Sequence, residues 1–150
     1  MALKSDRYEL QTDISFFYNA AATTRGCLVA HGATVGSGAA MDQGVNLCAK
    51  STSAAPLGIL LNDVVDKDLT RTHLNQYKDE VQKGGKVTVL RKGYVVTNDL
   101  TDSGSISAGS AAYQCETTAG NIATSGTNVV GSFLSTADAD GYAKVEVNLP

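Results

Sequence analysis

A succession of short apolar runs separated by turn residues is the feature that most constrains this chain. The strongest run, at residues 57–61, reads LGILL and predicts a central strand. Every second residue from Val145 to the end of the run at 142–149 is apolar, which predicts a paired strand with one buried face. Similar runs predict strands at residues 26–30, 45–49, 86–98, 111–115, 122–124 and 128–134. Short strands at this spacing indicate an all-β barrel or sandwich.

Two stretches leave alternatives open. Residues 86–98 fit two strands that meet near Gly93 or one strand with a bulge there. In the charged stretch 62–83, Asp68 is a suitable cap for a short helix around 68–80. A long excursion at the rim of a barrel fits that stretch equally well.

The amino-terminal segment, residues 4–18, mixes charges with three consecutive aromatic residues and contains neither Gly nor Pro. Its apolar residues fall near helical spacing, but β-forming neighbours weaken that pattern, so a short helix or an extended arm would fit. We therefore divide the chain into an amino-terminal arm or contact segment, residues 1–22, and a single β-rich domain, residues 23–150.

Composition excludes several classes of protein. The 150 residues fit one ordinary domain, and no apolar run approaches the roughly 18 residues of a membrane span. The start of the chain lacks the basic and apolar regions of a signal peptide, which predicts synthesis in the cytoplasm. Three cysteines without CxxC spacing predict neither disulfides nor zinc, so we expect buried free thiols at Cys27, Cys48 and Cys115.

Charge is distributed unevenly along the chain. Residues 1–92 carry 11 of the 12 Lys and Arg, whereas residues 93–150 carry one Lys and six acidic residues. The net charge of −3 gives no overall attraction to nucleic acid. One basic cluster has an aromatic neighbour that could stack on a base; it consists of Lys83, Lys86, Arg91 and Lys92, with Tyr94 nearby. Acidic residues lie close to this cluster in the sequence, so a nucleic-acid partner is not predicted.

The sequence contains little that could carry out catalysis. Only His31 and His73 could act as an imidazole base, and no GxSxG elbow surrounds any serine. Two acidic groups lack the Glu that completes a calcium loop; they are Asp63, Asp66 and Asp68, and the Asp138-Ala139-Asp140-Gly141 turn. The glycines at 32, 36 and 38 have no Lys-Ser or Lys-Thr pair at the spacing of a phosphate-binding loop. We therefore predict no enzymatic activity, no cofactor and no metal.

Residues 56–149 also carry a wider pattern. Residues 86–97 form a Val-rich stretch around Lys92-Gly93, and residues 108–113 combine glycine and small residues with a final Tyr. Residues 130–134 contain a Val-Gly-x-apolar step, residues 142–149 alternate, and residues 57–65 supply an apolar core run. Together these stretches resemble small head-decoration (cement) proteins of tailed bacteriophages.

The resemblance implies a small β-barrel or β-tulip-like domain that binds the outer capsid surface of the virion. It also implies contact with the major capsid protein and a homo-oligomer, with a trimer favoured and a dimer possible. Aromatic and Arg side chains are the usual interface anchors, so the predicted capsid or subunit contacts are Arg7, Tyr8, Phe16, Phe17 and Tyr18. Packing of this segment on its own domain is the alternative. The alternative functions are a tail-tube or fibre-base module and a carbohydrate-binding β-domain.

Overall fold

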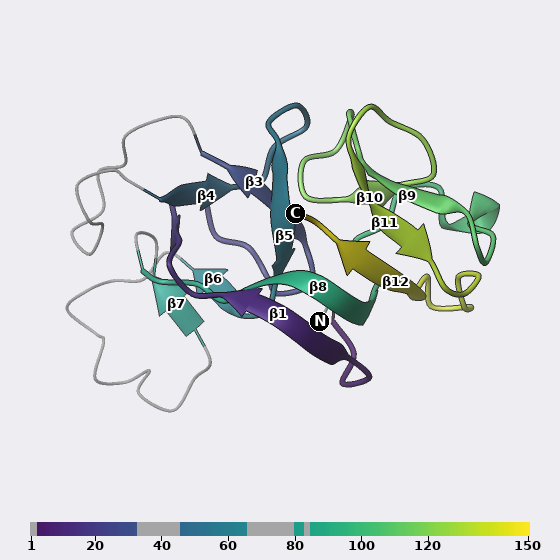
Figure 1. The fold of residues 1–150 in the computed structure, drawn as a ribbon, viewed down its shortest axis with the longest axis horizontal. Coiled ribbons are helices and arrows are strands. Elements are labelled where there is room, and N and C mark those ends of the chain that lie inside the picture. The colour runs from purple at the N-terminus through teal and green to yellow at the C-terminus, as the bar shows by residue number, and fades with distance from the viewer. Residues whose placement is uncertain (1–2, 33–45, 66–79, 83–84) are drawn as a thin grey trace.

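The computed structural model describes residues 3–32, 46–65, 80–82 and 85–150, and nearly all of its regular structure is β (Figure 1). The predicted all-β class is confirmed. Among the described residues, the one helical segment is the 3-10 turn η2 (Ser103–Ser105). The strands are β1 (Tyr8–Asp13), β2 (Phe17–Tyr18), β3 (Leu28–His31), β4 (Leu47–Ala49), β5 (Pro56–Leu60), β6 (Asp63–Val65), β7 (Glu80–Gln82), β8 (Val89–Thr97), β9 (Ala111–Gln114), β10 (Ile122–Ala123), β11 (Val129–Phe133) and β12 (Ala143–Asn148).

Ten of these strands form one mixed sheet. Its order is β10-β9-β11-β12-β8-β5-β3-β4-β2, and β1 is added to β8. The β2–β4 pair is parallel, and the other strand pairs of this sheet are antiparallel. A separate small sheet consists of β6 and β7, which run parallel.

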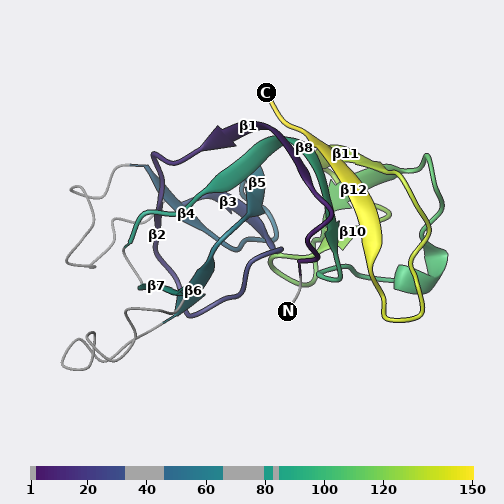
Figure 2. The ribbon, with the colours of Figure 1, turned by 90° about the horizontal axis from the view of Figure 1, so that it is seen from below.

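Strand β8 joins the two halves of the large sheet because it pairs with three other strands. It pairs with β1 over Val89–Tyr94, with β5 at Val89–Leu90 and with β12 over Lys92–Thr97. A strand has only two edges, and β1 overlaps both other partners along β8. Strands β5 and β12 therefore share one edge of β8, and β1 covers the opposite edge, where it runs along the outside of the molecule (Figure 2).

The strand at each end of the large sheet is bridged to the chain that flanks β8. At one end, Phe17 of β2 forms a bridge with Lys86, just before β8. At the other end, Ile122 of β10 bridges Leu100, just after β8, and its amide donates to the Asp99 carbonyl at 3.0 Å. The sheet is therefore curled at both ends, which satisfies the backbone groups of its terminal strands.

Two hydrophobic cores fill the two curled halves. The carboxy-terminal core includes Ile122, Val130, Phe133, Val145 and Val147. The amino-terminal core includes Phe16, Tyr18, Val29, Cys48 and Leu57.

Strands β3, β5 and the start of β8 form the wall between the cores. In β3, Leu28 faces the carboxy-terminal core and Val29 faces the amino-terminal core. In β8, Leu90 faces the carboxy-terminal core and Val89 faces the amino-terminal core. Both faces of this wall are buried, which explains why residues 57–61 are continuously apolar and do not alternate.

The structure decides between most of the alternatives that the sequence left open. The predicted central strand at 57–61 is confirmed as β5, which lies between β3 and β8. Of the two interpretations of 86–98, a single irregular strand is correct, since β8 runs unbroken through Gly93. The predicted helix around 68–80 lies outside the described residues, apart from Glu80, which begins β7.

Of the short helix and the extended arm that the sequence allowed, the amino-terminal segment adopts the extended form, because β1 and β2 are both strands. The division of the chain at residue 22 stays a prediction. Strands β1 and β2, which precede that position, pair with β8 and β4, which follow it. Among the described residues, no helix has the length and apolar character needed to cross a membrane.

We predict that Phe133→Ala destabilises the fold strongly, because the Phe133 side chain is fully buried in the carboxy-terminal core. Truncating a buried Phe leaves a cavity and costs about 3–5 kcal/mol in the free energy of unfolding. Urea denaturation measures this value. The matched control is the next residue, since Leu134 is 43% exposed and Leu134→Ala should change stability far less. Equal losses for the two variants would contradict the assigned core.

Candidate contact surface

The chain before β2 lies along the outer edge of β8. Leu3 is buried in the carboxy-terminal core and bridges Thr97, and the Lys4 amide donates to the Val96 carbonyl at 2.9 Å. From there the chain continues into β1, which pairs with β8 in the antiparallel direction. The amino-terminal segment is therefore part of the sheet in this structure.

Gly93 permits the close approach of β1 to β8. Its φ is +139°, a conformation that favours glycine, and a Cβ atom there would collide with the Tyr8 carbonyl oxygen. The pairing is locally irregular at Leu10 and Arg91. The extra residue on β1 is compensated by one on β8. Tyr8 lies opposite Tyr94 before the irregularity and Asp13 lies opposite Val89 after it, so the register is the same on both sides.

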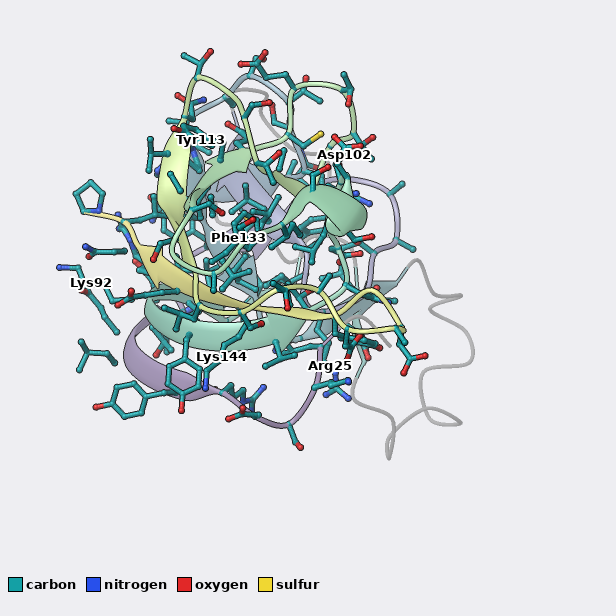
Figure 3. The ribbon with its side chains drawn as sticks, turned by 90° about the vertical axis from the view of Figure 1, so that its right-hand side faces the viewer. Arg25, Lys92, Asp102, Tyr113, Phe133 and Lys144 are labelled. Carbon is teal, nitrogen blue, oxygen red and sulfur yellow. The ribbon has the colours of Figure 1, made fainter. Side chains whose placement is uncertain are left out.

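Aromatic and charged side chains hold β1 in place from one face. The Tyr8 ring stacks on the Tyr94 ring of β8, with the centroids 5.9 Å apart. Lys144, which projects from β12 toward this side (Figure 3), places Nζ 3.8 Å from the Tyr94 centroid and 3.5 Å from the Asp6 carboxylate. Three strands thus contribute to one cluster of stacked rings and a cation.

A second cation anchors the start of the segment. The Lys4 Nζ lies 3.0 Å from the Asp138 carboxylate and 4.2 Å from the centroid of the Tyr142 ring. The Tyr142 and Asp140 amides also donate to Asp138. The Tyr142 amide and Lys4 are the main causes that hold the pKa of Asp138 below its usual range. The turn that resembles a calcium loop therefore contacts a lysine.

Strand β1 is exposed along its length. Tyr8 is 54% exposed and Leu10 is 66% exposed, and Ile14, just beyond the strand, is 63% exposed. These are three of the five large hydrophobic side chains that are exposed in the described part of the chain. We call residues 7–14 the β1 surface. A concentration of exposed apolar side chains of this kind is typical of an interaction surface.

The five predicted contact residues lie in two different environments. Arg7 and Tyr8 lie on the β1 surface, where Arg7 Nε contacts Glu9 at 2.8 Å. Phe16, Phe17 and Tyr18 are buried within their own chain. The alternative interpretation, packing of the segment on its own domain, describes these three residues.

Phe16 and Tyr18 anchor the β1 surface to the amino-terminal core. Both belong to that core, and the Val87 amide donates to the Phe16 carbonyl at 3.0 Å. Phe16 also packs edge-on against His31, with the ring centroids 5.6 Å apart. Between this anchor and β1, the Ser15 amide and hydroxyl donate to Asp13, and these bonds are the main causes that lower its pKa.

Sequence reasoning did not identify Leu10, Ile14, Tyr94 or Lys144 as part of this surface. Two polar residues, Glu9 and Gln11, flank Leu10, so its exposure is compatible with the local pattern. The positions of Tyr94 and Lys144 beside Tyr8 follow from the strand order, since β8 lies between β1 and β12. Local sequence contains no signal for that order.

The three cysteines are buried and unpaired, as predicted. Burial raises the pKa of Cys27 to about 11 and is the main cause that raises the pKa of Cys48 to about 12. Cys115 differs. Burial alone would raise the pKa of its thiol, but hydrogen bonds from Thr101, Thr117 and the Thr118 amide outweigh that effect and lower it to about 7.

One pocket brings together several of the side chains that the sequence offered as candidates for catalysis. A pocket of about 240 Å³ is lined by His31, Cys48 and Lys50 among others, yet the raised pKa of Cys48 keeps that thiol protonated at neutral pH. In the described part of the chain, no three His, Cys, Asp or Glu side chains are grouped so that they could hold a metal ion.

Most of the other sequence candidates have partners or lie outside the described residues. Asp63 accepts a hydrogen bond from the Arg25 amide. In the basic cluster, Lys86 Nζ lies 5.7 Å from the centroid of the Phe17 ring. His73, Asp66, Asp68, Lys83 and the glycines at 36 and 38 lie outside the described residues.

Comparison with models of protein families gives a match over most of the chain. The family of structural cement proteins (E217 gp24/Pam3 gp6) matches residues 7–148, a span that contains the twelve strands of the described residues. A search of curated protein sequences found no match.

Asp138 should contribute to the acid sensitivity of the fold. Because its folded-state pKa is lowered, the ionised carboxylate contributes stability above its unfolded pKa of 3.8, and this contribution is lost as the pH falls through the folded value. Asp138→Asn should therefore lose more stability at pH 7 than at pH 3, as measured by urea denaturation at each pH. The same loss at pH 3 and pH 7 would contradict this assignment.

Iodoacetamide at pH 8 should modify Cys115 before the other two cysteines. The thiolate is the reactive form, and only Cys115 has a pKa below that pH. Its thiol also lines a pocket with Thr101 and Thr117. Mass spectrometry of peptides from the briefly treated native protein identifies the labelled residue, and Cys115→Ser is the control. Equal labelling of all three cysteines would show that unfolding controls the reaction.

Proposed function

We propose, from the premise that this chain belongs to the phage family of structural cement proteins, that it binds the outer surface of the head and stabilises contacts between capsomers. The observation that carries the proposal is the family match, which extends from β1 through β12. Membership of this family implies association with the capsid of the virion. We further propose that the binding partner is the major capsid protein and that the chain is made in the host cytoplasm.

The fold supports a mechanical role. Two buried cores share one wall, and both ends of the large sheet close on the chain that flanks β8. Such a domain can resist deformation when neighbouring subunits move. Repetition on a lattice supplies the strength that a single modest contact lacks, because many bound copies act together.

We also propose that the protein is not an enzyme. Its family is a structural one. In the described cavity at His31 and Cys48, the raised pKa of Cys48 keeps the thiol protonated at neutral pH, so this cysteine is a poor nucleophile.

The contact role is proposed for Arg7 and Tyr8, which lie on the β1 surface. Three buried residues fix the segment to the rest of the chain and so hold the β1 surface in position; they are Phe16, Phe17 and Tyr18. Deleting residues 1–18 would therefore remove core side chains together with the surface. Point variants on the exposed residues test the contact without this complication.

We predict that Arg7→Ala combined with Tyr8→Ser weakens binding to expanded heads that lack this protein. Truncating anchor residues of an interface typically costs more than about 1 kcal/mol each, so the concentration needed for half-occupancy should rise about tenfold or more. Co-sedimentation with the heads measures the occupancy, and circular dichroism checks the fold. Val129→Ser is the matched control, because Val129 is 55% exposed but lies on β11.

Wild-type protein that does not pellet with heads would contradict the proposed function. Binding to isolated tails would favour a tail component, and binding to an immobilised polysaccharide would favour a carbohydrate-binding domain. Wild-type binding that the double variant matches would leave the cement function in place and remove Arg7 and Tyr8 from the contact.

A further inference from the structure

A pocket beside the start of the amino-terminal segment is lined by three basic side chains. Its volume is about 230 Å³, and its described lining residues are Leu3, Lys4, Ser5, Arg7 and Arg25. None of these residues is acidic, whereas three carry a positive charge. Arg25 comes from a separate loop and lies beside the chain that leads into β1 (Figure 3). The fold therefore brings like charges together around one small space.

Hydrogen bonds fix the loop that carries Arg25 against the start of the chain. The Arg25 amide donates to the Asp63 carboxylate at 2.9 Å. The carbonyl of the next residue, Gly26, accepts a hydrogen bond from the Thr97 hydroxyl at 3.0 Å. Thr97 also bridges Leu3, so this one residue of β8 joins the two segments that line the pocket. The pocket is therefore built by the same pairing that places the amino-terminal segment on β8.

Two of the three cations contact a carboxylate of their own chain. Arg7 Nε lies 2.8 Å from Glu9, and Lys4 Nζ lies 3.0 Å from Asp138. A guanidinium has five N–H donors and an ammonium has three, so each of these groups keeps donors for another acceptor. In the described part of the chain, Glu9 and Asp138 are not lining residues of the pocket. These contacts therefore orient the two cations and leave the space between them to an anion.

We propose that this pocket binds one carboxylate side chain of the major capsid protein, an Asp or a Glu, between Lys4, Arg7 and Arg25. The inference rests on the proposed cement function for the identity of the partner, and it adds the chemistry of the contact. Arginine matches the geometry of a carboxylate with two parallel hydrogen bonds. Arg7 begins the β1 surface, so the pocket is continuous with the contact proposed for that surface.

Size and charge favour a single carboxylate over a polyanion. The volume lies below the range of about 300–1,000 Å³ that is typical of pockets for drug-sized ligands, so it suits one side chain. Glu9 and Asp138 lie beside the cations and would repel a chain of phosphates. The protein as a whole is also negative, with a net charge of −3. These charges disfavour a nucleic acid at this pocket.

Titration with sodium acetate tests the pocket in the absence of heads. NMR spectra of the isotope-labelled protein at constant ionic strength should show saturable shifts at the Nε–H groups of Arg7 and Arg25. Arg25→Gln should weaken the affinity for acetate about tenfold or more, because hydrogen bonds to a charged group are lost. Lys92→Gln is the matched control, since it removes one positive charge from β8 and Lys92 does not line the pocket.

A second variant keeps the test decisive if the half-buried Arg25 is needed for folding. Arg7→Gln changes an exposed side chain and should also weaken the affinity for acetate, and circular dichroism checks the fold of each variant. The absence of saturable shifts with acetate would overturn the proposal, as would equal affinities of the wild type and both variants. Saturation by inorganic phosphate without an effect of acetate would overturn the assignment of a carboxylate.

Co-sedimentation with expanded heads that lack this protein tests the partner. Arg25→Gln should raise the concentration needed for half-occupancy about tenfold or more, and Lys92→Gln should match the wild type. Equal binding of the wild type and Arg25→Gln would overturn the contact and leave the cement function in place. Wild-type protein that does not pellet would overturn both the cement function and the capsid partner, and the acetate titration would still decide whether the anion pocket exists.

Discussion

Backbone pairing along β8 is the constraint on which the rest of the structure depends. This strand receives β1 on one edge and both β5 and β12 on the other, so it connects the two halves of the sheet. Its first residues also face both cores, because Val89 and Leu90 belong to different ones. The exposed position of β1 follows from this arrangement, since one edge of β8 is already occupied and the other is left for the amino-terminal segment.

The sequence predicted the wall and the carboxy-terminal strand well because burial leaves a local pattern. Residues 57–61 are apolar without interruption, as a strand buried on both faces must be. Strand β12 alternates because one face contacts the core and the other is wet, and its burial follows the predicted alternation. In each case a few consecutive residues contain the whole signal.

The contact surface was only partly predictable, because its composition depends on which strands are neighbours. Arg7 and Tyr8 were found from residue type, yet the same criterion selected Phe16, Phe17 and Tyr18, which are buried. Residue type does not distinguish an aromatic anchor of an interface from an aromatic anchor of a core. The position of Lys144 beside Tyr94 is fixed by pairing between strands that are about fifty residues apart in sequence, and single-sequence reasoning has no access to such distant contacts.

The pairing of both chain ends with β8 has a consequence for the timing of assembly. Leu3 bridges Thr97, and the Leu149 amide donates to the Arg91 carbonyl, so the first and last described segments meet on the same strand. The carboxy-terminal core cannot close until β12 has emerged from the ribosome, because Val145 and Val147 of that strand belong to the core. Contacts between such distant segments are slow to form. A chain from which β12 has not yet emerged therefore lacks the closed carboxy-terminal core, and the pairing on both edges of β8 is completed only after that strand has been made.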